Sequence, residues 1–175
     1  HSSLADHSAF QFKEKCGVEI DEVTEGEMPQ NELWIRVIRA RNLRVMDARD
    51  FITGSGGSSD PVATVRVAGK KYETRVINKT LEPIWNEEFR FIVFDPDDFV
   101  DVMIEDQDPL SRDFMGKFSI RLDTLYQDKA KVHLSWHKLK DKNGRSTATG
   151  LGEVEIQMQW IFNPTLDIPD AMKTG

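Results

Sequence analysis

The chain has 175 residues, which is enough for one domain with short extensions. A domain of this size can be stabilised by its hydrophobic core without a disulfide or a structural metal. Its single cysteine, Cys16, excludes an internal disulfide, and no apolar run reaches the about 20 residues of a membrane-spanning helix. The net charge of −7 is uneven, because residues 1–30 carry −5 and the remainder −2. A basic stripe typical of nucleic-acid binding is absent from the sequence. We expect a soluble, cytoplasmic monomer that binds no nucleic acid.

Apolar alternation with a period of two, which indicates half-buried β-strands, dominates the chain from residue 33. The first run alternates through Val37, and a slip of phase then leads to Ala40. Eight short runs in all have the spacing of a β-sandwich; they cover residues 33–43, 63–67, 72–76, 89–93, 100–104, 118–122, 132–136 and 153–160. The sequence predicts an all-β fold, an eight-stranded antiparallel Greek-key β-sandwich. Helical turns are expected only near residues 95–98 and 123–128.

The last run is the most regular of the eight. Its predicted inward residues alternate with acidic and amide residues that are predicted to face outward: Val154, Ile156, Met158 and Trp160 against Glu153, Glu155, Gln157 and Gln159. Both ends of the chain differ from this pattern. Residues 1–30 form an acidic leader, read as a linker or as an extra edge strand through Val18, Ile20 and Val23; residues 31–162 form the domain; residues 163–175 form a tail or linker. We expect a module of a larger protein.

Five aspartates stand where predicted strands end. Asp47 follows the first strand, Asp60 precedes the second, Asp106 and Asp108 leave the fifth, and Asp113 closes the loop after it. Loops at one end of an antiparallel sandwich can converge, and carboxylates brought together repel one another unless a cation lies between them. Calcium, with six to eight oxygen ligands, suits such irregular loops. On spacing alone, solvated turn residues remain the alternative.

Five motifs follow one another in order along the domain. They are Leu33-x-Ile35-x-Val37-x-x-Ala40-x-Asn42-Leu43, Ser59-Asp60-Pro61, the run 80–89 with Pro83, Trp85, Asn86 and Phe89, Val102-x-Ile104-x-Asp106-x-Asp108, and Phe114-Met115-Gly116. Together they resemble the C2 domain, the calcium- and phospholipid-binding module of protein kinase C and the synaptotagmins. The late position of the regular last strand is similar to the permuted (type II, phospholipase-like) C2 topology.

The resemblance implies a calcium-dependent module that docks on anionic phospholipid membranes in signalling or trafficking, without catalysing a reaction. It implies calcium ligands at Asp47, Asp60, Asp106, Asp108 and Asp113, supplemented by Ser111 and by the carbonyls of Met46 and Gln107. The loop that holds Asp108 is one residue shorter than in synaptotagmin-like members, so the position of Asp113 before the Phe114-Met115-Gly116 motif identifies it. Asp50 is a spare acid that we expect to be solvated. The module would be peripheral to membranes when calcium is present.

Apolar residues at the tips of the same loops are candidates for membrane contact. Phe51 and Ile52 in the first loop and Leu110 in the third are expected to enter the interface, with Arg112 reaching lipid phosphates. The alternative for Phe51 and Ile52 is that they fold back over the sandwich.

The basic run Lys70, Lys71 and Arg75 matches the strand through which some family members bind phosphoinositides. Glu73 interrupts the run with a negative charge, which favours a solvated strand of mixed charge.

Two other classes of function compete with this hypothesis. One is a calcium-independent interaction module that binds a partner protein through the sandwich faces or the acidic leader. The other is an enzyme, because paired carboxylates also serve glycosidases. The acids here are too numerous and too confined to loops for that chemistry, so we expect no enzyme.

Overall fold

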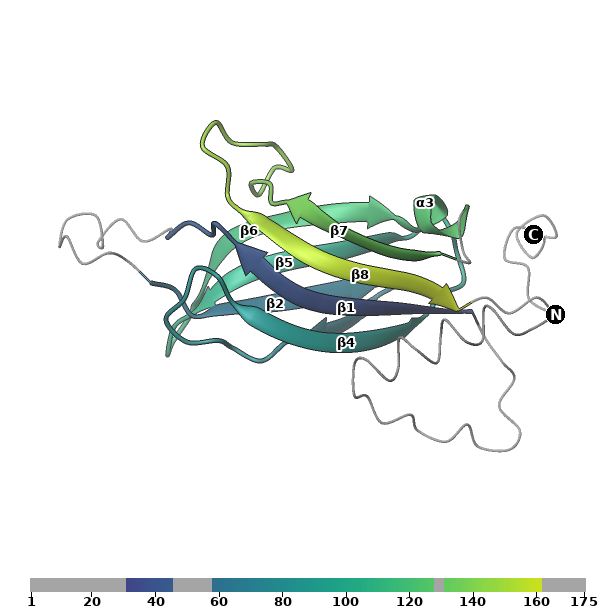
Figure 1. Cartoon of the computed structure of the whole chain (residues 1–175), viewed down its shortest axis with the longest axis horizontal. Coiled ribbons are helices and arrows are strands. Elements are labelled where there is room, and N and C mark those ends of the chain that lie inside the picture. The colour runs from purple at the N-terminus through teal and green to yellow at the C-terminus, as the bar shows by residue number, and fades with distance from the viewer. Residues whose placement is uncertain (1–30, 46–57, 128–130, 162–175) are drawn as a thin grey trace.

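The computed structural model describes residues 31–45, 58–127 and 131–161, and shows two stacked antiparallel sheets of four strands (Figure 1). The first sheet has the order β4-β1-β8-β7 and the second the order β3-β2-β5-β6. The elements are β1 (Glu32–Arg41), β2 (Pro61–Val67), β3 (Lys70–Glu73), β4 (Ile84–Ile92), β5 (Phe99–Gln107), β6 (Arg112–Arg121), α3 (Leu122–Tyr126), β7 (Val132–Lys138) and β8 (Glu153–Ile161). The predicted eight-stranded sandwich is confirmed. The last strand lies between β1 and β7, and its assignment to the permuted topology stays a prediction.

Alternation along the strands builds the core between the sheets. Leu33, Ile35 and Val37 of β1 are fully buried, and Ala63 and Val65 of β2 meet them from the second sheet. The phase slip predicted in the first strand is a β-bulge between Val37 and Arg39, present in the pairing of β1 with both of its neighbours. A bulge adds one residue to one strand, so the residues after it regain the core-facing side.

Three local predictions need correction. Residues 95–98 form a turn and not a helical start, since the Asp98 amide donates to the Asp95 carbonyl (3.1 Å) and the Asp97 amide to the Asp95 carboxylate (2.8 Å). Asp side chains that bond their own backbone in this way compete with a helix. The third strand was predicted at 72–76 but ends at Glu73, and the sixth was predicted at 118 but begins at Arg112. The helical turn near 123 is confirmed as α3.

Four connections meet at one end of the sandwich, which we call the loop end. At the left of Figure 1, β1 ends and β8 begins there, and the strand pairing adds the start of β2 and the end of β5. Backbone hydrogen bonds join these connections across long stretches of sequence. The Gln107 amide donates to the Asp60 carbonyl (2.9 Å), the Thr80 amide to the Ser59 carbonyl (2.9 Å), and the Leu43 amide to the Leu81 carbonyl (3.3 Å).

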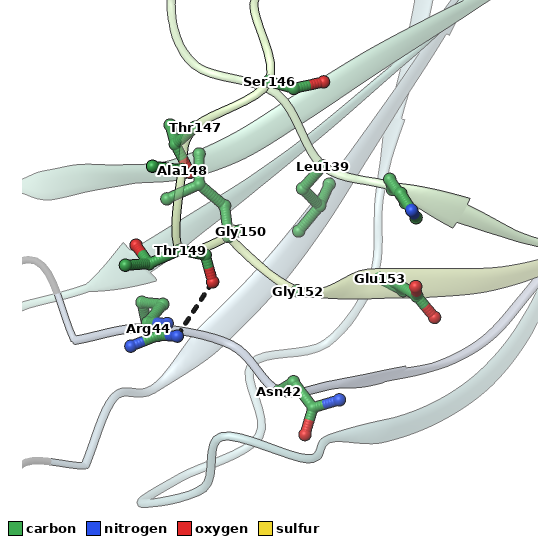
Figure 2. Close-up of a pocket in the computed structure, with 12 residues that line it drawn as sticks. Asn42, Arg44, Leu139, Ser146, Thr147, Ala148, Thr149, Gly150, Gly152 and Glu153 are labelled. Atoms are coloured by element: carbon green, nitrogen blue, oxygen red, sulfur yellow. Dashed lines mark hydrogen bonds between the residues drawn. The ribbon is translucent and has the colours of Figure 1, made fainter.

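The connection from β7 to β8 packs against the end of β1 and borders an open pocket of about 390 Å³ (Figure 2). Arg44 closes one side by donating to the Thr149 carbonyl (2.9 Å). Gly152 permits this approach, because a Cβ at that position would lie 2.7 Å from the Arg41 carbonyl oxygen and 2.8 Å from that of Asn42. Its φ of +99° is also unfavourable for any residue with a side chain.

Gly152→Ala should therefore destabilise the domain. We expect the free energy of unfolding to fall by about 3 kcal/mol, because overpacking costs ~1–3 kcal/mol and a positive φ about 1–2 kcal/mol more. Gly144→Ala is the matched control, since Gly144 also has a positive φ (75°) but has no atom near its would-be Cβ. Urea unfolding measures both, and equal losses would contradict the close backbone approach.

Candidate metal centre

The hairpin of β5 and β6 places two of the predicted ligands directly opposite each other. Asp106 pairs with Asp113, and Gln107 with Arg112. The turn between the strands is tight, since the Asp108 amide donates to the Ser111 carbonyl (2.9 Å). Directly opposed residues of an antiparallel pair project to the same side with Cβ atoms about 4.5–5.5 Å apart. The register of the strands therefore brings the two carboxylates together.

Asp108 completes a group of three carboxylates. One oxygen from each of Asp106, Asp108 and Asp113 lies within 4.8 Å of the others, with the first two half-buried and the third exposed. Oxygens that ligate calcium lie 2.3–2.6 Å from the ion, so two of them can be at most about 5 Å apart. The three oxygens satisfy that limit as they stand. The donor set, all hard oxygens, fits a calcium ion.

Asp60 lies beside this group without being one of the three. Its amide donates to Oδ1 of Asp106 (2.8 Å), which holds that carboxylate in place. Oδ1 of Asp60 itself accepts from the Lys79 amide (2.6 Å). The sequence identified both aspartates, and the structure adds that the backbone of one orients the side chain of the other.

The remaining predicted ligands are divided between described and undescribed parts of the chain. Gln107 and Ser111 belong to the tight turn, and the Gln107 side-chain amide donates to the Asp108 carbonyl (2.8 Å). Five residues of the first loop lie outside the described residues: Met46, Asp47, Asp50, Phe51 and Ile52.

The guanidinium of Arg112, the neighbour of Asp113 in the sequence, is engaged by an acid outside the carboxylate group. Arg112 forms a two-pronged hydrogen bond with Glu73 (2.8 and 3.0 Å) and also donates to the Gln107 side chain (2.5 Å). Its hydrogen bond lowers the pKa of Glu73, and the same bond raises the pKa of Arg112. Among the described residues, no lysine or arginine forms an ion pair with Asp106 or Asp113. The negative charge of these two side chains is therefore not neutralised by a basic side chain in that part of the protein.

The contact between Glu73 and Arg112 was missed from the sequence. The two residues are 39 positions apart, and only the pairing of β3 with β2, of β2 with β5 and of β5 with β6 brings them near. The interruption of the basic run by an acid was the one available signal. Its partner could not be inferred without the sheet order.

The other predicted surface residues have definite surroundings. Leu110 is fully exposed at the tip of the turn. Lys70 lies 4.9 Å from the centroid of the Tyr72 ring, Lys71 is 3.4 Å from Glu73, and Arg75 donates to the Trp85 carbonyl (3.1 Å). These contacts favour the mixed-charge interpretation of the strand. In the part of the chain that the structure covers, no helix has the length and apolar character needed to span a bilayer.

Comparison with known proteins gives one consistent result. The C2 domain family matches residues 31–139. Extended synaptotagmin-1 of Rattus norvegicus is 30% identical over 148 residues, which cover 83% of this chain and only 12% of that protein. GTPase activating protein 1 of Oryza sativa subsp. indica is 29% identical over 158 residues, 74% of this chain and 91% of the relative. A solved, calcium-bound structure of two C2 domains of extended synaptotagmin 2 superimposes with a TM-score of 0.62 at 26% identity, over 76% of this chain and 46% of that one.

The three carboxylates of the group repel one another when no cation is present. This repulsion should lower the free energy of unfolding of the domain. Asp113→Asn is expected to raise the free energy of unfolding in chelator by up to about 1 kcal/mol, the repulsion of two charges 4 Å apart in water. Glu82→Gln, at an exposed acid outside the group, should change it little. Denaturant unfolding of the three proteins in chelator tests this. A lower stability for Asp113→Asn would mean that the carboxylate makes favourable contacts instead.

Proposed function

This chain belongs to the C2 domain family, and on that premise we propose that it is a module that docks on anionic phospholipid membranes when calcium binds at its loop end. The observation that carries the proposal is the group formed by Asp106, Asp108 and Asp113, whose oxygens lie within 4.8 Å of one another. The family resemblance adds Asp60, beside the group, and Asp47, in the first loop. The proposal concerns a binding module, with no catalytic step.

Charge explains how metal binding and docking would be coupled. Residues 31–175 carry a net charge of −2, which becomes +3 when the five proposed ligands are set aside. Without a cation, the acids at the loop end repel an anionic surface. Bound calcium would supply positive charge and open coordination positions there for lipid phosphate. No large rearrangement is required, because the strand register already holds the carboxylates together.

Leu110 provides the second part of the proposed docking. It follows Asp108 by two residues and is fully exposed. The free-energy cost of exposing this apolar side chain to water would be removed if the tip lay in the interface of a bilayer. We propose the same role for Phe51 and Ile52 of the first loop. Arg112 is a poorer candidate than the sequence suggested, since it would have to exchange the Glu73 carboxylate for a lipid phosphate.

Removal of one ligand tests the proposed metal site. Asp108→Asn should weaken calcium binding at least about tenfold, equivalent to 1.4 kcal/mol, because it removes one charge from the ligand set. Glu82→Gln is the matched control and should bind as the parent does. Isothermal titration with calcium, and the rise in Tm on adding calcium, are the measurements. A parent protein that gives neither heat nor a shift in Tm would favour the calcium-independent interaction module.

Shortening the exposed tip tests membrane insertion separately. Leu110→Ala should weaken binding to phosphatidylserine-containing vesicles about fivefold, because partial burial of a leucine contributes about 1 kcal/mol. Leu134→Ala is the control, since Leu134 is 58% exposed on the outer side of β7, away from the loop end. Sedimentation with calcium and with chelator measures both. Equal effects of the two substitutions would contradict the proposed insertion of Leu110. They would not contradict the proposed metal site.

A further inference from the structure

The connection from β7 to β8, which starts at the loop end, pairs with β6, the edge strand of the second sheet (Figure 1). Its Lys140 forms an antiparallel bridge with Lys117 of β6, in which the amide of each lysine donates to the carbonyl of the other (2.8 and 3.0 Å). Leu139 packs directly on Gly116, where a Cβ would lie 2.7 Å from the Cβ of Leu139. Two backbone hydrogen bonds and a close side-chain contact therefore fix the position of this bridge.

The bridge sets two positive charges directly opposite each other. Residues that exchange both hydrogen bonds across an antiparallel pair have Cα atoms about 5.5 Å apart, and their side chains project to the same side. Phe118 belongs to the core, so its neighbour Lys117 points to the outer side of the second sheet, and Lys140 shares that side. Like charges in this position destabilise a sheet unless an anion lies between them.

Among the described residues, no acid neutralises this pair. Neither Lys117 nor Lys140 forms an ion pair with a described aspartate or glutamate. The acid that follows Lys140 in the sequence, Asp141, is engaged by the backbone of its own turn. Its Oδ1 atom accepts from the amides of Asn143 and Arg145 (2.9 Å each). The two ammonium groups therefore have no carboxylate partner in the part of the chain that the structure describes.

A third lysine extends the pair toward the carboxylate group. The Nζ atom of Lys142 lies 5.6 Å from the centroid of the Phe114 ring, and Phe114 directly follows Asp113 in β6. Lys142 also forms no ion pair with a described acid. We call Lys117, Lys140 and Lys142 the lysine group. It is a basic surface that begins where the acidic surface of the loop end stops.

On the premise of the proposed membrane docking, we propose that the lysine group binds the phosphomonoester of a phosphorylated lipid headgroup. At pH 7 a phosphomonoester carries a charge of about −1.5 to −2 and has three strong acceptor oxygens. Each lysine offers three N–H donors, so one such phosphate can bridge Lys117 and Lys140 and offset their repulsion. A phosphodiester carries a single negative charge and offsets less of it. The chemistry of the lysine group therefore favours a lipid with an added phosphate over other anionic lipids.

The position of the lysine group along β6 matches the place of such a phosphate. Lys117 follows Asp113 by four residues, which is about 13 Å of extended strand. Calcium at the carboxylate group would meet the phosphodiesters at the membrane surface. A phosphomonoester on the sugar ring of a headgroup projects from that surface into water, toward a site set back from the loop end. One orientation of the domain on a membrane therefore serves both sites.

The lysine group is distinct from the basic run of β3, which lies at the opposite edge of the second sheet. Lys71 is 3.4 Å from Glu73, and Lys70 lies 4.9 Å from the centroid of the Tyr72 ring. The acid of that strand competes with a lipid phosphate for Lys71. Lys70 and Lys71 are therefore a matched control for the lysine group, with the same residue type and the same change of charge on substitution.

Sedimentation with vesicles of equal net charge tests the proposal. Phosphatidylcholine vesicles contain either a phosphatidylinositol monophosphate or enough phosphatidylserine to match its charge, and calcium is present. The parent protein should bind the first kind more tightly. Lys140→Gln combined with Lys142→Gln should weaken that binding about fivefold for each lysine and remove the preference. Lys70→Gln combined with Lys71→Gln should keep the preference.

Folding and charge are controlled separately. Lys140→Arg combined with Lys142→Arg keeps the charge and should keep the preference. The Tm of the glutamine variant should not fall, because the substitution removes a contact between like charges. A parent protein without the preference, a preference that survives the glutamine variant, or an equal loss in the β3 variant would overturn the proposal. Failure of the proposed function gives a different result, namely binding to phosphatidylserine vesicles that is the same in calcium and in chelator.

Discussion

The register of one hairpin is the constraint on which the candidate site depends. Pairing of β5 with β6 sets Asp106 opposite Asp113, and a shift in that pairing at Ile104 and Glu105 determines which side the two carboxylates share. They cannot separate without breaking strand hydrogen bonds. Ile104 and Met115, fully buried on the two strands, hold the pairing in place from the core. Burial of such side chains contributes about 1.5–3 kcal/mol each, more than the roughly 1 kcal/mol of repulsion between two charges in water.

The side chains around Asp106 and Asp113 do not neutralise the negative charge of these two carboxylates in the described part of the protein. A guanidinium close to acids would ordinarily neutralise them, but the arginine of this hairpin is held by a carboxylate from β3 on the far side of β2. Its planar fork matches that carboxylate with two hydrogen bonds, which fixes its direction. Meanwhile the Asp60 amide holds the Asp106 side chain. Among the described residues, Asp106 is thus oriented by a backbone amide and Arg112 is engaged by Glu73, so neither Asp106 nor Asp113 forms an ion pair with a basic side chain there.

The sequence predicted the strands well because both sheets bury one side, which imposes a period of two; even the bulge after Val37 appeared as a slip of phase. It predicted the acids of the hairpin through a family motif and their places at strand ends. It placed the start of β6 six residues too late, since Arg112 and Asp113 are polar and resemble a loop. Contacts between distant strands, such as that of Glu73 with Arg112, depend on sheet order, which alternation does not encode. The burial of Trp34 was also beyond prediction, because an outward position in an alternating strand is expected to be solvated.

Chain direction separates the two features of the molecule. β1 begins beside Trp34, a buried side chain on the outer side of the first sheet, and ends at the loop end, where it leads into the first loop. Trp34 and the carboxylate group therefore lie at different ends of the sandwich, joined by a central strand with partners on both sides. A strand paired on both sides transmits little local displacement, because any shift must break two ladders at once.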